Sequence, residues 1–159
     1  MTNLHDTIQR TRDYLEAQGW TFYIEGELHK PKAHPEVSHR VLMRFLEEGG
    51  FGGICIHPWK LIGVGLDKHT RVYIHEMVHA LRGYPGEAKI DEYREESVVE
   101  LVVKLIAGYW ESDHYAGVFY AKYVNLGGMD SIDDLKSEAL EMYEKYFINE
   151  EQLETSGVL

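Results

Sequence analysis

The sequence predicts an α+β fold with a small, mostly antiparallel sheet followed by a helical C-terminal part. Two observations support this prediction. Short segments rich in β-branched and aromatic residues occur before residue 67, and such segments are typical of strands. Segments in which apolar residues recur at helical spacing lie mainly after residue 69. Strands that cluster early and helices that cluster late are typical of α+β domains rather than of alternating βαβ units.

The N-terminal part of the chain is expected to form two helices and one strand. Asn3 can cap a first helix that Gly19 ends. The aromatic segment 20–26 is typical of a strand. Residues 35–50 combine helical spacing with two final glycines, and they therefore predict a second helix.

A β-hairpin is predicted next. The apolar runs 52–56 and 60–66 flank Pro58, and proline favours a turn between two such runs. We expect the segment 62–66 to be the edge of the sheet, where an extended peptide could pair with it.

Four helices are predicted after the hairpin. The first begins at a cap, either Asp67 or Thr70, and ends at Gly83. Three further segments have helical patterns and are separated by serine or glycine: 91–110, 112–123 and 131–147.

The composition is that of one globular domain. The chain has 159 residues, of which 44% are hydrophobic and 27% charged, so we expect a single domain over 1–148 and a flexible tail over 149–159. The one cysteine, Cys55, excludes an internal disulfide and a four-cysteine zinc site.

Charge and hydropathy argue against two classes of binding partner, nucleic acids and membranes. The formal net charge of −11 disfavours binding to nucleic acid phosphates. No apolar run approaches the roughly 20 residues that span a bilayer, and the N-terminal segment lacks the apolar centre of a signal peptide. The sequence therefore predicts a cytoplasmic protein that does not associate with membranes.

The predicted helix before Gly83 carries the pattern H-E-x-x-H, formed by His75, Glu76 and His79. Residues four apart share one face of a helix, so the two histidines can bind one zinc ion. Glu76 lies about 100° round the helix from His75, near enough to take a proton from a water but badly placed to bind the metal. Because zinc lowers the pKa of a coordinated water from about 15.7 toward about 7, the pattern predicts hydrolysis with Glu76 as general base.

A third protein ligand is expected in the segment 91–110, because zinc takes about four ligands. The alternative for its acidic residues is an ordinary exposed face. The segment is largely apolar, however, and a buried carboxylate is costly without a partner. Glu96 is the predicted ligand, and Glu92 and Glu95 are the competing choices. Glu100, one turn after Glu96, is expected to accept a hydrogen bond from a ligand histidine and fix its tautomer.

The two motifs together resemble those of gluzincin metallopeptidases. "HEMVH" is followed by "ESVVE", with 16 residues between His79 and Glu96. The short spacing after a small sheet looks like that of ImmA/IrrE-type metallopeptidases and of the metallopeptidase domain of ArdC-type antirestriction proteins, over about residues 50–148. The resemblance implies a zincin-like fold, bound zinc and peptide-bond hydrolysis. For the biological role, the resemblance implies two alternatives: cleavage of a repressor protein, or antirestriction.

Other residues near these motifs have less definite roles. Hydrolysis needs a donor that stabilises the oxyanion, and Tyr84, Tyr93 and His114 are the candidates. Cys55 lies in an apolar segment and is expected to be buried and unreactive. His57, at the turn, is expected to pack or face solvent rather than bind metal.

The sequence thus favours a zinc-dependent metalloendopeptidase with Glu76 as the general base. Its expected substrate is a protein or peptide, a regulatory protein being one candidate. The alternative is a catalytically silent zinc-bearing binding module, such as an acidic decoy or an antirestriction-type partner of another protein. Its acidic surface would come from residues 130–154, where nine acids face two lysines. A third hypothesis is a helical domain without metal.

Overall fold

The computed structural model describes residues 3–24, 52–65 and 70–148. A 3₁₀ turn at His57–Trp59 joins β2 to β3, and a π-helical turn at Glu144–Ile148 follows α6. The predicted helix over 35–50 and the predicted tail over 149–159 lie outside the described residues. The helices and strands are α1 Leu4–Ala17, β1 Thr21–Ile24, β2 Gly53–Ile56, β3 Leu61–Val64, α3 Thr70–Arg82, α4 Lys89–Ala107, α5 Trp110–Asn125 and α6 Ile132–Tyr143.

The described strands form one mixed sheet in the order β1-β3-β2. The predicted hairpin is confirmed, because β2 and β3 are antiparallel with Gly53 opposite Val64. The prediction of a mostly antiparallel sheet is wrong, because β1 pairs with β3 in parallel, with Thr21 opposite Leu61. Parallel pairing needs a long connection, and the chain between β1 and β2 is long enough to supply one.

The position of β3 also differs from the prediction. Residues 61–64 are buried throughout, because β3 lies between β1 and β2. The edge of the sheet beside α3 is therefore β2, whose residues are all half-buried. Among the described strands, the sheet edge on the α3 side therefore belongs to residues 53–56, and the prediction that 62–66 form the edge is wrong for β3.

Side-chain caps are present at two helices, and the one at Asn3 was predicted. The Asn3 side chain accepts a hydrogen bond from the Asp6 N–H at 2.8 Å, which caps α1. Ser131 and Asp134 form a capping box at the start of α6, in which each side chain accepts a bond from the other residue's backbone N–H. These contacts satisfy backbone donors that the first helical turn leaves free.

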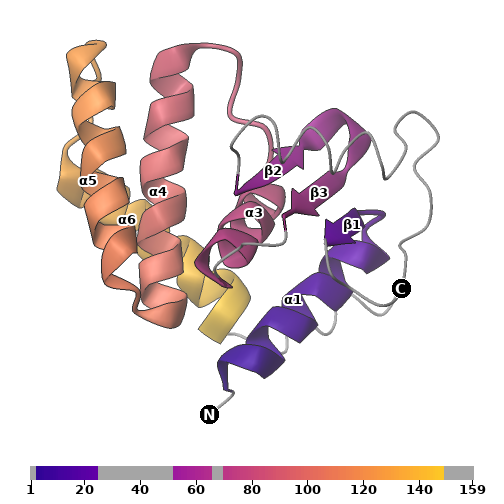
Figure 1. The fold of residues 1–159 in the computed structure, drawn as a ribbon. Helices are drawn as coiled ribbons and strands as arrows, with labels where there is room; N and C mark the ends of the chain where they lie inside the picture. The colour runs from indigo at the N-terminus through magenta and orange to yellow at the C-terminus, as the bar shows by residue number, and fades with distance from the viewer. Residues whose placement is uncertain (1–2, 25–51, 66–69, 149–159) are drawn as a thin grey trace.

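Helix α3 lies at the centre of the molecule, between the sheet and α1 on one side and α4 on the other (Figure 1). Its Ile74 and Val78 are buried in a cluster with Val98 and Val102 of α4. Its Met77 is buried in a second cluster with the sheet. Full burial of each such side chain contributes about 1.5–3 kcal/mol, so the position of α3 is fixed from both sides.

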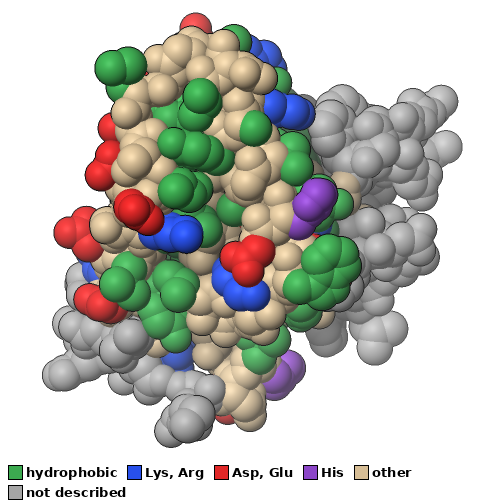
Figure 2. Space-filling view, turned by 90° about the vertical axis from the view of Figure 1, so that its left-hand side faces the viewer, with side chains coloured by type: hydrophobic (Ala, Val, Ile, Leu, Met, Phe, Trp, Pro, Cys, Tyr) green, Lys and Arg blue, Asp and Glu red, His purple; other side chains and the backbone are tan. Residues whose placement is uncertain are grey.

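Helix α5 covers the outer side of α4 and presents apolar side chains to solvent (Figure 2). Large hydrophobic residues exposed on α5 and just after it are Trp110, Tyr115, Val118, Val124, Leu126 and Met129. Among the described helices, none is both long enough and apolar enough to cross a bilayer.

Candidate metal centre

Helices α3 and α4 run in opposite directions and bring three potential metal ligands together. Glu96 Oε2 lies 2.9 Å from His75 Nε2, and Glu96 Oε1 lies 3.0 Å from His79 Nε2. The two histidine Nε2 atoms are 3.0 Å apart. All three ligand atoms lie within 4.8 Å of one another, so this group could hold a metal ion.

The structure separates the three glutamates between which the sequence left a choice. Glu96 faces both histidines. Glu95 instead forms two contacts with Arg82, at 2.6 and 2.8 Å. Glu92 is more exposed and pairs with Lys89 at 3.2 Å. Of the three, Glu96 is therefore the residue placed to bind an ion with the histidines.

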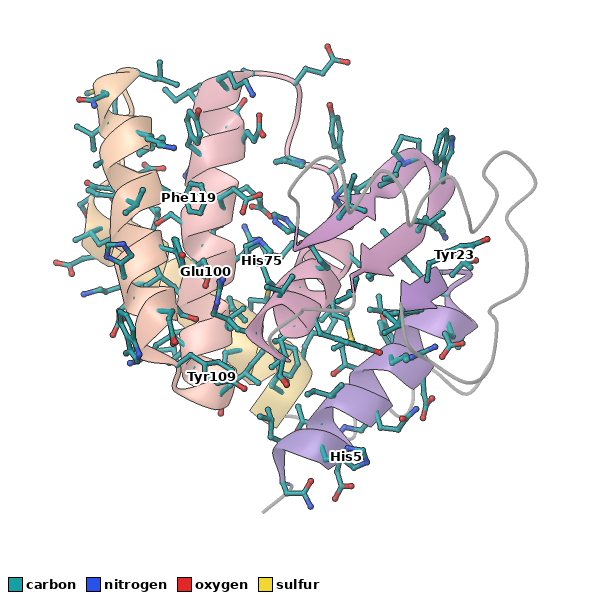
Figure 3. All side chains as sticks on the ribbon, in the orientation of Figure 1. His5, Tyr23, His75, Glu100, Tyr109 and Phe119 are labelled. Carbon is teal, nitrogen blue, oxygen red and sulfur yellow. The ribbon has the colours of Figure 1, made fainter. Side chains whose placement is uncertain are left out.

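Glu100 contacts His75 as the sequence predicted. The residue is 1% exposed, and its Oε1 accepts a hydrogen bond from His75 Nδ1 at 2.9 Å. Figure 3 shows the two side chains facing each other between α3 and α4. The same oxygen is paired with Arg71. With Nδ1 engaged by Glu100, the Nε2 atom of His75 is the one that faces the ligand group.

The surrounding charges make the site attractive to a cation. Burial by itself lowers the pKa of His75, but hydrogen bonds to Glu100 and Glu96 outweigh it and raise the pKa to about 10. Burial by itself raises the pKa of Glu96, but hydrogen bonds from His75 and His79 hold it well below its usual range. A proton on His75 thus satisfies the carboxylates, and a metal ion would compete for the same imidazole nitrogen.

Glu76 lies beside the three potential ligands but faces strand β2. It is 7% exposed, and its carboxylate has no hydrogen bond or ion pair with the described residues. Strand β2 passes close to it, since a Cβ atom on Gly53 would lie 2.9 Å from Glu76 Cγ. The pKa of Glu76 is raised above its ordinary value, chiefly because the carboxyl group is buried. Such a carboxylate is suited to accept a proton near neutral pH.

A cleft of about 660 Å³ opens above the three ligand residues, between β2 and α4. Tyr84 and Tyr93, two of the three oxyanion candidates, line it. His114 is exposed on α5 and contacts Tyr115, and it is not among the described residues that line the cleft. The other lining residues are Gly53, Ile54, Cys55, His57, His75, Glu76, His79, Pro85, Gly86, Glu87, Glu92, Glu96 and Phe119.

Cys55 and His57 also line the cleft, and Cys55 alone of the two differs from its prediction. Cys55 is half-buried rather than buried, because β2 is the edge strand. Burial and the nearby Glu76 raise the pKa of its thiol, which keeps it protonated and unreactive as expected. His57 packs between Trp20 and Tyr84, at ring distances of 5.8 Å to each.

Arg71 and Gly53 are the site residues that the sequence did not reveal. Arg71 stands four residues before His75, so its position on the same helix face was a signal that could have been used. Gly53 carries no comparable local signal, because its role depends on the approach of β2 to α3.

No protein-family model, no curated protein and no solved structure matches the chain. The resemblance of the two motifs to those of gluzincins remains a prediction.

Proposed function

We propose that the protein is a zinc-dependent metallopeptidase in which His75, His79 and Glu96 bind the metal. One observation carries the proposal: Glu76, a buried carboxylate without a described hydrogen-bond partner, lies in the same cleft as these three converging ligands. A group that only stored a metal would not need a free carboxylate beside it.

The residues fit zinc in their chemistry. Catalytic zinc sites use three protein ligands and leave a further position open, and one known set of ligands is two histidines and one glutamate. The residues here offer the same set of donor atoms. When bound, zinc acts as a Lewis acid that polarises a carbonyl and makes water a stronger nucleophile.

The chain's own groups would perform the remaining steps. The Glu76 carboxylate would take a proton from a water in the cleft and then give it to the leaving amine. Glu100 would keep His75 oriented through Nδ1. Strand β2, which is outermost among the described strands, could pair with an extended peptide. The hydroxyl of Tyr84 or Tyr93 could donate to the oxyanion.

The test combines metal analysis with one substitution. Protein purified without added metal should contain close to one zinc per chain. E76Q should keep that zinc but lose peptide hydrolysis by a factor of about 100 or more, since general base catalysis contributes about 10²–10⁴-fold. E92Q is the matched control, because Glu92 lines the same cleft and faces Lys89 rather than the histidines. Zinc-free protein, or full hydrolysis by E76Q, would contradict the proposal.

A zinc-bearing binding module would instead bind zinc without any turnover. That alternative relies on the acids of the C-terminal helix: Asp133, Asp134, Glu138 and Glu141. The structure gives two of them a role within the fold, because Asp134 completes the α6 cap and Glu138 pairs with Arg82 and Arg94. The described contacts therefore favour the enzyme over the decoy.

A further inference from the structure

Charged and imidazole side chains alternate across the contact between α3 and α4. Arg71, His75 and His79 recur every four residues on α3, and Glu96 and Glu100 do so on α4. Arg71 contacts Glu100, Glu100 contacts His75, His75 contacts Glu96, and Glu96 contacts His79. We call these five residues the α3–α4 ladder. Arg71 is the one member to which no role has been given above.

Among the described residues, the Glu100 carboxylate is contacted by Arg71 and by His75. Its Oε1 atom receives both the Arg71 and the His75 contacts, while Oε2 is buried and has no hydrogen-bond partner among the described residues. A buried carboxylate is strongly disfavoured unless a charge or hydrogen bonds compensate it.

Arg71 is itself held in place by a third helix. Its guanidinium lies 4.7 Å from the ring centroid of Tyr115 on α5, and its side chain is 17% exposed. Cation–π contact at such a distance restricts the guanidinium as well as stabilising it. Arg71 therefore presents a fixed charge to Glu100 rather than a mobile surface charge.

The balance of charge at the proposed metal centre also indicates a role for Arg71. Glu76, Glu96 and Glu100 bring three carboxylates into one partly enclosed region. A divalent cation would balance two of these negative charges, and Arg71 supplies the third positive charge. A neutral centre is far less costly to enclose than one with excess charge.

We propose that Arg71 is a positioning residue of the metal centre. It holds the Glu100 carboxylate against His75 Nδ1, so that His75 Nε2 is directed at the metal. This inference rests on the proposed binding of zinc by His75, His79 and Glu96.

The first test is zinc affinity, measured by competition with a chromophoric chelator. R71Q should bind zinc about 10–100-fold more weakly, which is the usual effect of losing a group that orients a ligand. R71K should recover part of the loss, because lysine restores the charge without the planar fork of arginine. R12Q is the matched control: Arg12, on α1, also pairs with a carboxylate, that of Glu16, and lies 4.8 Å over a ring, that of Phe22. Its hydrogen bond to α3 goes to the Tyr73 hydroxyl rather than to a member of the ladder. R12Q should bind zinc as the wild type does.

A double-mutant cycle separates positioning from general stability. If Arg71 acts through Glu100, the R71Q/E100Q variant should bind zinc no more weakly than E100Q alone. The imidazole ¹⁵N spectrum of the zinc-loaded protein gives a second readout. The His75 Nδ1 proton should exchange faster with solvent in R71Q than in the wild type, since its acceptor is no longer held.

The outcomes distinguish the two proposals. If the wild type binds no zinc, the proposed function itself fails. If the wild type binds zinc but R71Q binds it equally well, the role of Arg71 is wrong while the proposed function stands. Equal losses in R71Q and R12Q, or fully additive losses in the R71Q/E100Q variant, would also overturn the role of Arg71.

Discussion

Among single residues, Gly53 determines whether Glu76 can lie in the cleft. A Cβ atom at Gly53 would lie 2.9 Å from Glu76 Cγ and 2.9 Å from Val72 Cγ1. Nonbonded carbon atoms pack at about 3.5–4.0 Å, so G53A should force β2 or Glu76 to move. We expect a loss of about 1–3 kcal/mol in the free energy of unfolding, measured by urea titration. Peptide hydrolysis should fall, while zinc content should stay at the wild-type level because Glu76 is not a ligand.

Gly117 provides the control for this substitution. It lies within α5, and no surrounding heavy atom is within 4 Å of where its Cβ would be. G117A should raise the free energy of unfolding by about 0.5–1 kcal/mol, because alanine is the better helix residue. Wild-type stability and hydrolysis in G53A would show that the close approach of β2 does not limit the site.

The difference between Glu96 and Gly53 shows which site residues could be predicted. His75, His79 and the acidic residues that include Glu96 and Glu100 were predicted from four-residue spacing, a local property of helices that left Glu92 and Glu95 as competing ligands. The convergence of Glu96 on the histidines and the contact of Glu100 with His75 agree with that prediction. The role of Gly53 depends on how a strand passes over a helix, and no local pattern in the chain encodes that approach.

Among the elements, a second group of ion pairs joins α3, α4 and α6 at the far end of their contact. Arg82 contacts Glu95 at 2.6 Å and Glu138 at 2.5 Å. Arg94 contacts Glu138 at 2.9 Å and Asp130 at 2.7 Å. Hydrogen bonds from Arg94, and then from Arg82, lower the pKa of Glu138 from its ordinary value.

This shift predicts a pH-dependent contribution of Glu138 to stability. A carboxylate whose pKa is lower in the folded state stabilises the fold above its unfolded pKa, which is about 4.3 for glutamate. The contribution is lost as the pH falls through the lower, folded value. E138Q should therefore be less stable than the wild type at pH 7, and the difference should shrink as the solution is acidified. Urea titrations at a series of pH values measure it.

Glu141 supplies the comparison, because it is exposed on the same helix and has no ion pair with the described residues. E141Q should match the wild type over the whole pH range. A stability loss in E138Q that does not change with pH would show that its cause is packing rather than charge.

The sheet shows the limit of prediction for elements. The hairpin of β2 and β3 was predictable, because Pro58 and the short turn bring adjacent segments together. The parallel pairing of β1 with β3 joins segments far apart in the chain, and alternation of side chains does not specify the partner or its direction. The same missing information led to the wrong choice of edge strand.

For the whole molecule, α3 connects two parts whose cores are otherwise separate clusters. A metal bound by α3 and α4 would add a link between them, so its removal should destabilise the entire fold. Free zinc at about 100 times its Kd contributes about 2.7 kcal/mol to stability. Removing it with a chelator should lower Tm by about 5–10 °C for a chain of this size, measured by calorimetry.

H79A tests whether this shift comes from the proposed site. The variant should melt lower than the zinc-loaded wild type, and its Tm should not respond to chelator. An unchanged wild-type Tm after chelation would favour the hypothesis of a helical domain without metal.

The α3–α4 ladder also determines how far one helix can slide along the other. Helical surfaces repeat every turn, so apolar packing alone permits neighbouring alignments that differ by about four residues. Displacing α4 by one turn in one direction would place Lys104 opposite Arg71, and two like charges would meet in a largely enclosed contact. Arg71, a member of the α3–α4 ladder, therefore disfavours this displaced alignment of the two helices, even before any ion binds.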